Sequence, residues 1–116
     1  MDKIEQLTEE TFEAAVSRPG ITVIDFWAEW CGPCRAMGPQ FERAAVLRPQ
    51  YRFAKVDVDA EPGVAAAYGI RSIPTLMVLL DGEPVAGQSG VIAAEDLVAA
   101  VDRITSTLGP SQRAAA

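Results

Sequence analysis

The sequence predicts an α/β domain, with a mixed central β-sheet of four to five strands flanked by about four helices. Strand-like apolar runs alternate with helix-length segments along the chain, as in folds built from β-α-β units. The run 21–28 is nearly continuous in apolar, β-branched and aromatic residues, which is typical of a strand covered on both faces. Near the end, Asp81-Gly82 indicates a tight turn and therefore a closing antiparallel hairpin.

The first half of the chain is expected to alternate between strands and helices. A short strand covers 4–7, and Thr8 is placed to cap the helix that follows it. After the apolar strand, residues 34–48 carry apolar side chains at the spacing of one helical face. Residues 51–59 then read as a second internal strand. Because a helix joins these two strands, we expect them to be parallel.

The second half of the chain completes the sheet and ends in a helix. Residues 61–68 form a short helix, and a loop leads from it into the strand 76–80. The strand 84–88 contains proline and glycine, which suits the edge of a sheet. Acidic residues favour the start of the last helix, and Gly109-Pro110 is expected to end it.

Length and charge limit the class of protein. The chain has 116 residues, enough for one domain, and a net charge of −6, which argues against nucleic acid or an anionic membrane as a partner. Its first residues lack an apolar signal segment, and no run approaches the roughly 18 apolar residues of a membrane span. We therefore expect a cytoplasmic monomer, with one domain over 1–109 and a disordered tail over 110–116.

The chemistry of the chain is concentrated in residues 25–35, which hold its two cysteines. Cys31 lies in the turn after the apolar strand, and Cys34 lies where the next helix is expected to start. The N-terminus of a helix favours a thiolate, which is the nucleophile in disulfide exchange. With two cysteines and no histidine, one chain cannot supply four Cys/His ligands to a structural zinc. A metal shared between two chains is the alternative, and we expect none.

A carboxylate interrupts the apolar strand. Asp25 is either a structural carboxylate bonded to backbone or a nearby cation, or a buried proton acceptor with a raised pKa. The residues alone leave both interpretations open. Lys55, on the next predicted strand, is either an ordinary solvent-facing side chain or faces Asp25 and holds its charge.

Two segments resemble the thioredoxin family. Asp25-Phe26-Trp27-Ala28 followed by Trp30-Cys31-Gly32-Pro33-Cys34 looks like that family's active site. The segment Gly69-Ile70-Arg71-Ser72-Ile73-Pro74-Thr75 is similar to the loop before its cis-proline. The resemblance covers about 8–108 and implies the thioredoxin fold. It looks closest to the second bacterial type, although this chain contains no N-terminal zinc ribbon with two further C-x-x-C pairs.

The resemblance implies a role for each matched residue. Cys31, expected at the exposed end of the motif, would be the nucleophile and Cys34, deeper in the helix, the resolving thiol, and together they would form a redox-active disulfide. Asp25 would accept a proton, with Lys55 as its partner. A cis peptide bond is expected before Pro74, and the backbone beside it would pair with a substrate strand. The rim that contacts substrate would consist of Trp30, Gly32, Pro33, Ile73, Pro74, Gly90 and Val91.

The activity implied is reduction of protein disulfides by dithiol–disulfide exchange. Thioredoxin reductase would be the partner that returns electrons from NADPH, and no cofactor would be bound because the chain has no Gly-rich nucleotide loop. An oxidase or isomerase with the same fold is one rival, although the Gly-Pro dipeptide resembles the reductants. A non-enzymatic scaffold or holdase that uses the same apolar rim is the other rival.

Overall fold

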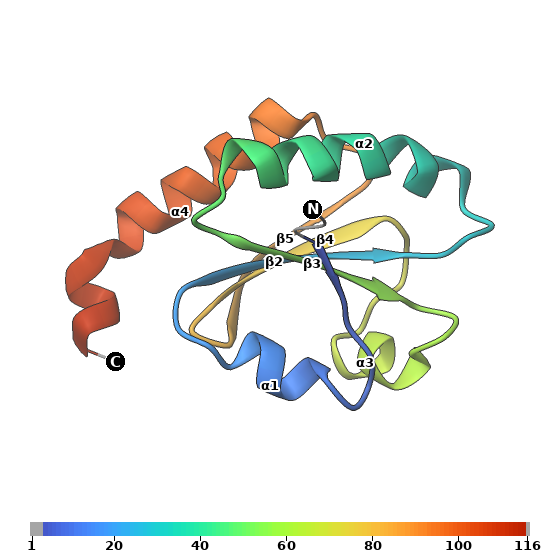
Figure 1. Cartoon of the computed structure of the whole chain (residues 1–116), viewed down its shortest axis with the longest axis horizontal. Helices are drawn as coiled ribbons and strands as arrows, with labels where there is room; N and C mark the ends of the chain where they lie inside the picture. The colour runs from blue at the N-terminus through green and yellow to red at the C-terminus, as the bar shows by residue number, and fades with distance from the viewer. Residues whose placement is uncertain (1–3, 116) are drawn as a thin grey trace.

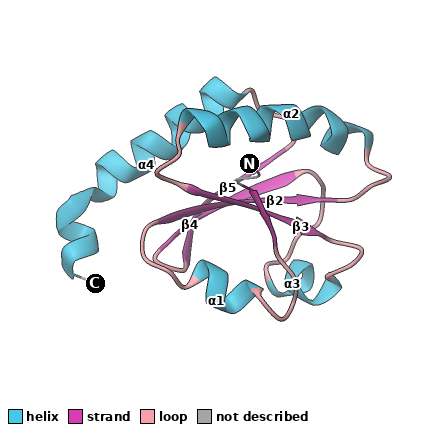
Figure 2. Ribbon diagram, viewed as in Figure 1, coloured by secondary structure: helices cyan, strands magenta, loops and turns pink. Residues whose placement is uncertain are grey.

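The structure is a computed structural model that describes residues 4–115, with side chains described as far as residue 107. One mixed sheet lies between two layers of helices, with α2 and α4 on one face and α1 and α3 on the other (Figures 1 and 2). This arrangement confirms the predicted fold class. In chain order the elements are β1 (Ile4–Gln6), α1 (Phe12–Val16), β2 (Ile21–Trp27), α2 (Gly32–Leu47), β3 (Arg52–Asp57), α3 (Pro62–Ala67), β4 (Thr75–Leu80), β5 (Glu83–Ser89) and α4 (Ala94–Ala115).

The strand β2 lies at the centre of the sheet, whose order is β1-β3-β2-β4-β5. It pairs in parallel with β3 and antiparallel with β4, and helices cover both of its faces. This position explains its apolar sequence, because side chains of both orientations are buried there. The predicted hairpin is also confirmed: β4 and β5 are antiparallel, and Asp81 and Gly82 in their turn both have positive φ.

Side chains alternate across the sheet into two cores. Val23 on β2 and Phe53 on β3 pack with α2 and α4, whereas Ile24 and Phe26 pack with α1 and α3. Because successive strand residues point to opposite faces, the side chains at Asp25, Trp27 and Lys55 belong to the α2 side. The sheet therefore presents its one buried carboxylate toward the helix that carries the cysteines.

Two helices begin elsewhere than the sequence predicts. The prediction that Thr8 caps α1 is wrong, because α1 begins at Phe12. The Thr8 N–H donates to the Thr11 hydroxyl at 2.9 Å, and the Thr11 N–H donates to the Thr8 hydroxyl at 3.2 Å. The two threonines therefore close a turn ahead of the helix. The second helix, α2, begins at Gly32, two residues earlier than expected.

The last helix does not end at Gly109-Pro110, since α4 continues to Ala115. A proline removes one backbone donor, and a helix can continue beyond it with that one hydrogen bond lost. The side chains of the predicted tail, 110–116, lie outside the described residues, and the division of the chain at residue 109 stays a prediction. Neither α4 nor any other helix in the described part of the chain is long and apolar enough to cross a membrane.

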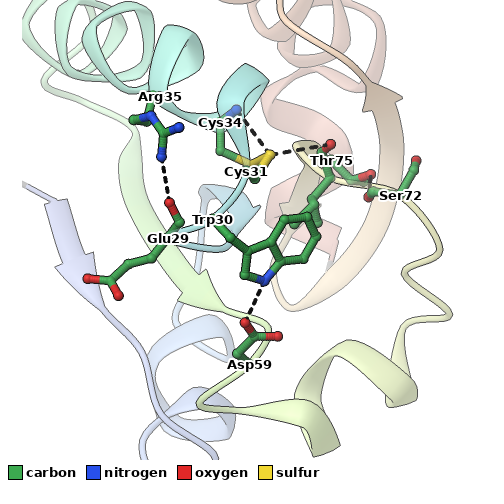
Figure 3. Close-up of a disulfide and its surroundings, with 9 residues drawn as sticks. Glu29, Trp30, Cys31, Cys34, Arg35, Asp59, Ser72 and Thr75 are labelled. Carbon is green, nitrogen blue, oxygen red and sulfur yellow. Dashed lines mark hydrogen bonds between the residues drawn. A yellow bond between two sulfur atoms is a disulfide. The ribbon is translucent and has the colours of Figure 1, made fainter.

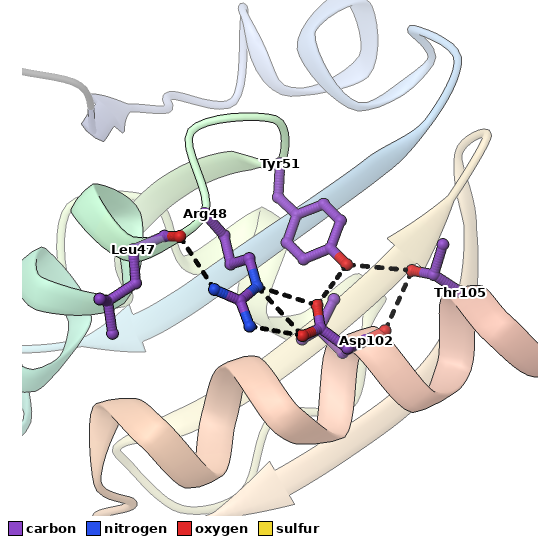
Figure 4. Close-up of polar contacts among 6 residues, drawn as sticks. Leu47, Arg48, Tyr51, Asp102 and Thr105 are labelled. Atoms are coloured by element: carbon purple, nitrogen blue, oxygen red, sulfur yellow. Dashed lines mark hydrogen bonds and ion pairs between the residues drawn. The ribbon is translucent and has the colours of Figure 1, made fainter.

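A polar cluster joins the end of α2 to α4 across the start of β3 (Figure 4). The Arg48 guanidinium donates from Nε and Nη2 to Asp102, with a shortest distance of 2.6 Å. The Tyr51 hydroxyl donates to the same carboxylate at 2.6 Å. These bonds, with the Arg48 hydrogen bond first, hold the pKa of Asp102 below its ordinary value.

Replacement of Asp102 with alanine should lower the melting temperature by about 4 °C, because Arg48 and Tyr51 both lose their acceptor. The effect should shrink as the pH falls, since a carboxylate with a depressed folded pKa stabilises the fold above its unfolded pKa and less as it becomes protonated. Thermal unfolding between pH 3 and 7 measures both. The exposed Glu42→Ala on α2 is the control, and an equal loss there would contradict this role for the cluster.

Candidate active site

The turn from β2 into α2 places Cys31 at the helix N-cap (Figure 3). Cys31 has an extended backbone, and its N–H donates to the Ala28 carbonyl at 3.2 Å. The Cys34 N–H then donates to the Cys31 Sγ at 3.1 Å. Pro33 lies in the first turn of the helix, where a missing backbone donor has no partner to lose. The sequence between the cysteines therefore starts the helix and directs the Cys34 N–H toward the Cys31 sulfur.

Cys31 and Cys34 form a disulfide, with their Cα atoms 5.2 Å apart. When the bond is reduced, a Cys31 thiolate would keep the Cys34 N–H donor and the positive end of the α2 dipole. The site can therefore hold the reactive form of this sulfur. Among the described residues, no group of three or more histidine, cysteine or acidic side chains is arranged to hold a metal ion.

The exposure of the two cysteines corrects one expectation. Cys31 was expected at the exposed end of the motif, but Cys31 and Cys34 are 4% and 6% exposed, so exposure does not distinguish them. Their surroundings do. The Cys31 sulfur lies 3.7 Å from the carbonyl oxygen of Ile73, on the loop before β4. Cys34 instead lines a cavity of about 510 Å³ together with Trp27 and Lys55.

A loop with a cis peptide bond faces the disulfide. The Ile73–Pro74 bond is cis, and Pro74 is buried. The Pro74 carbonyl accepts the Gly90 N–H at 2.9 Å, and Gly90 has φ +90°, a conformation that favours glycine. The Thr75 hydroxyl donates to the Ser72 carbonyl at 2.6 Å, which closes the loop (Figure 3). The fold thus brings the expected residues of three distant segments together.

Two of the residues expected in the rim, Trp30 and Val91, are exposed. Trp30 is 67% exposed, and its indole N–H donates to Asp59 at 2.7 Å (Figure 3). A small cavity of about 160 Å³ lies between Trp30 and Ile73, and Val91 is 47% exposed. Sequence reasoning missed Asp59, although the indole N–H of an exposed tryptophan beside a reactive turn signals the need for an acceptor. Trp27 packs against the cysteines, so its role is in the layer beneath them.

Asp25 is fully buried on β2, and neither of its carboxylate oxygens has a hydrogen-bond partner among the described residues. Burial raises the pKa of Asp25 from 3.8 to about 6, and the charge of Lys55 opposes this rise. A carboxyl group with such a pKa exchanges its proton near neutral pH. The structure therefore places a carboxyl group that titrates near neutral pH on the face of the sheet that α2 covers.

Lys55 is the strand neighbour of Asp25, because the two residues are partners in the β2–β3 register. The two side chains do not form a direct ion pair within the described residues. The Lys55 ammonium lies 5.0 Å from the centre of the Trp27 ring. Its charge acts on Asp25 through space, while Lys55 and Cys34 line the same cavity. Of the two readings of Lys55, this arrangement supports the one that pairs it with Asp25.

Comparison with known proteins agrees with this geometry. The thioredoxin family model matches residues 3–103. The chain is 47% identical over 87 residues to "Putative thioredoxin 2" of Streptomyces coelicolor and 42% identical over 93 residues to "Thioredoxin C-3" of Corynebacterium nephridii. These matches cover 75% and 79% of this chain but 65% and 64% of those proteins, so the chain spans less than two thirds of their length.

A third relative matches over nearly its whole length. "Thioredoxin 1" of Synechococcus elongatus is 41% identical over 99 residues, which cover 84% of this chain and 92% of that protein. The fold, the disulfide at the start of α2 and the cis-proline loop are thus found together with sequence similarity along most of the chain. The chain belongs to the thioredoxin family.

Proposed function

We propose that the chain is a thiol–disulfide oxidoreductase that reduces protein disulfides through Cys31 and Cys34. The observation that carries this proposal is the disulfide at the start of α2, whose Cys31 sulfur accepts a helix N–H and lies beside the Ile73 carbonyl. Family membership and the relatives named thioredoxin support it.

The first step is attack by the Cys31 thiolate on one sulfur of the substrate disulfide. A Cys31–substrate bond forms, the substrate S–S bond breaks, and the second substrate sulfur leaves as a thiolate that takes a proton from solvent. The Cys34 N–H and the α2 dipole stabilise the attacking thiolate. Because the Cys31 sulfur faces the Ile73 loop, the substrate enters from that side.

The second step releases the substrate. Asp25, with its pKa near 6 and ionised beside the charge of Lys55, accepts the Cys34 proton through a water, so the negative charge passes from the carboxylate to the Cys34 sulfur. The Cys34 thiolate attacks the Cys31 sulfur, the mixed disulfide breaks, and the first substrate sulfur leaves as a thiolate that takes a proton from solvent. Two electrons pass from the protein dithiol to the substrate, and the protein returns to its disulfide form.

The rim favours extended polypeptide over small disulfides. The exposed surfaces of Trp30 and Val91 flank the disulfide, and a substrate strand would pair with backbone groups at Ile73. The surface over Gly32 is open to that strand, since a Cβ at Gly32 would meet nothing within 4 Å. This surface suits unfolded or extended segments that contain a disulfide.

The protein disulfide must be reduced again after each turnover. We assign this step to a flavin-dependent thioredoxin reductase that draws electrons from NADPH, and we place the cycle in the cytoplasm with the chain as a monomer. The relatives named thioredoxin support the reductase as partner. No bound cofactor is needed in this cycle, because the disulfide itself carries the two electrons.

NADPH consumption with a bacterial thioredoxin reductase and a disulfide-bonded polypeptide tests this function. We expect turnover that needs the protein, the reductase and the substrate. A parallel assay replaces the reductase with a chemical dithiol, so that the chemistry is tested separately from the electron donor. Activity in the chemical-dithiol assay without activity in the reductase assay would support the exchange chemistry and leave the natural electron donor open. Inactivity in both assays would overturn the function and favour the scaffold reading.

A further inference from the structure

The segment 90–95 comprises the loop between β5 and α4 and the first two residues of α4, and it carries two residues of the rim, Gly90 and Val91. One end of it is held at the active site, because the Gly90 N–H donates to the Pro74 carbonyl at 2.9 Å. Val91 is 47% exposed beside this bond. The placement of Val91, which follows this bond in the chain, therefore depends also on how the other end of the segment is held.

The first turn of α4 has no capping side chain of its own. The Ala93 carbonyl accepts the Leu97 N–H at 2.9 Å, which makes Ala93 the N-cap, and alanine has no side-chain acceptor. Ala94, the first helical residue, is fully buried. Its N–H donates to the side-chain oxygen of Gln40 on α2, at 2.8 Å. A residue 54 positions away in the chain thus satisfies a buried helix donor.

Two further contacts from α2 hold the same segment. The sulfur of Met37, which is fully buried, accepts the Ile92 N–H at 3.5 Å. Arg43 forms an ion pair with Glu95. The three α2 residues are spaced by three along the helix, so they lie on neighbouring turns of one face. Because α2 begins at the cysteines, the contacts from this face fix the position of the segment 90–95 relative to the disulfide.

We propose that Gln40 is a positioning residue that sets Gly90 and Val91 relative to the Cys31–Cys34 pair, and so sets the affinity for protein disulfides. The inference rests on the proposed function. Gln40 is half-buried and acts through the segment 90–95 rather than by touching substrate. Its acceptor oxygen, rather than its size, carries the role, because the contact is a single hydrogen bond to a buried donor.

Two variants with side chains of similar length distinguish the role of the acceptor oxygen of Gln40 from that of its side-chain volume. Gln40→Met removes the oxygen, whereas Gln40→Glu keeps an oxygen in place and adds charge that a helix N-terminus favours. With a disulfide-bonded polypeptide, Gln40→Met should raise KM about fivefold with kcat within about twofold, and Gln40→Glu should restore KM. The rate with a small aliphatic disulfide, too short to reach Val91, should not change. Amide exchange at Ala94 should be about tenfold faster in Gln40→Met alone.

The outcomes separate this inference from the proposed function. The proposed function is tested by the unaltered chain, and it would be contradicted if that chain reduced no protein disulfide. If the unaltered chain is active, either of two results would contradict the positioning role of Gln40. Equal KM values for Gln40→Met and Gln40→Glu would show that the acceptor oxygen of Gln40 does not determine KM. An equal loss with the small disulfide would show general damage to the site instead of a displaced rim.

Discussion

Replacement of Cys34 with serine should convert the protein into a trap for its substrates. Cys31 in this variant still attacks a substrate disulfide, since its helix N–H donor is a backbone group of residue 34 and remains. The mixed disulfide then persists, because no second thiol can break it. Non-reducing electrophoresis and mass spectrometry should show one substrate chain per protein, bound at Cys31 and released by a dithiol.

The matched variant is Cys31→Ser, which keeps the Cys34 thiol. It should form no adduct at residue 34 on the same timescale, because the sulfur beside the Ile73 carbonyl, where the substrate strand is proposed to pair, is that of residue 31, whereas Cys34 lines the cavity with Trp27 and Lys55. Turnover should fall at least about 10³-fold in either variant, since each lacks one half of the disulfide. Adducts of Cys31→Ser at Cys34 in equal yield would reverse the assignment of nucleophile and resolving thiol.

Replacement of Asp25 with asparagine should stabilise the protein at neutral pH. The pKa of Asp25 is about 6 in the folded chain against an ordinary 3.8, so the folded state holds this proton more tightly than the unfolded state. A raised pKa of this kind contributes stability that is present below about pH 4 and is lost as the pH rises through 6. The difference corresponds to about 3 kcal/mol at pH 8.

Urea unfolding between pH 4 and 8 measures this effect. The unaltered chain should lose stability relative to Asp25→Asn as the pH rises, and the two should be similarly stable near pH 4, where both side chains are neutral. Glu42→Gln, an exposed change on α2, should follow the unaltered chain throughout. Parallel curves for Asp25→Asn and the unaltered chain would show that Asp25 does not carry a raised pKa.

The same variant should slow the release step. Asparagine cannot accept the Cys34 proton, so resolution of the mixed disulfide should lose the dependence on pH that an acceptor with a pKa near 6 confers. Stability and rate then change in opposite directions. A merely structural carboxylate would change stability alone.

Most of the fold could be predicted because the sheet is organised around one strand. The apolar run of β2 indicates burial on both faces, and the turn at Asp81-Gly82 indicates the hairpin. The ends of helices could not be predicted as well. The Thr8 and Thr11 side chains bond to each other's backbone instead of capping α1, and α4 continues beyond Pro110. Both outcomes depend on local competition between hydrogen bonds that residue preferences do not resolve.

Within the site, the sequence predicts which residues are reactive better than it predicts the contacts that these residues make. The spacing of Cys31 and Cys34 and the carboxylate at Asp25 carry a signal in the chain itself, and the cis bond at Pro74 followed from the resemblance. The sequence gives no signal for the low exposure of Cys31 or for the hydrogen bond between Gln40 and α4. Each depends on which distant segments meet in the fold. Sequence periodicity indicates which face of a single helix or strand is buried, whereas these contacts are made between two separate elements.

The central claim is that the dithiol itself carries two electrons to a protein disulfide. The most direct test mixes the fully reduced protein with an excess of a disulfide-bonded polypeptide, with no other reductant present. We expect one substrate disulfide reduced per protein chain, together with a mass loss of two hydrogens and a Cys31–Cys34 disulfide in the protein. A protein that remains fully reduced while the substrate keeps its disulfide would contradict the claim.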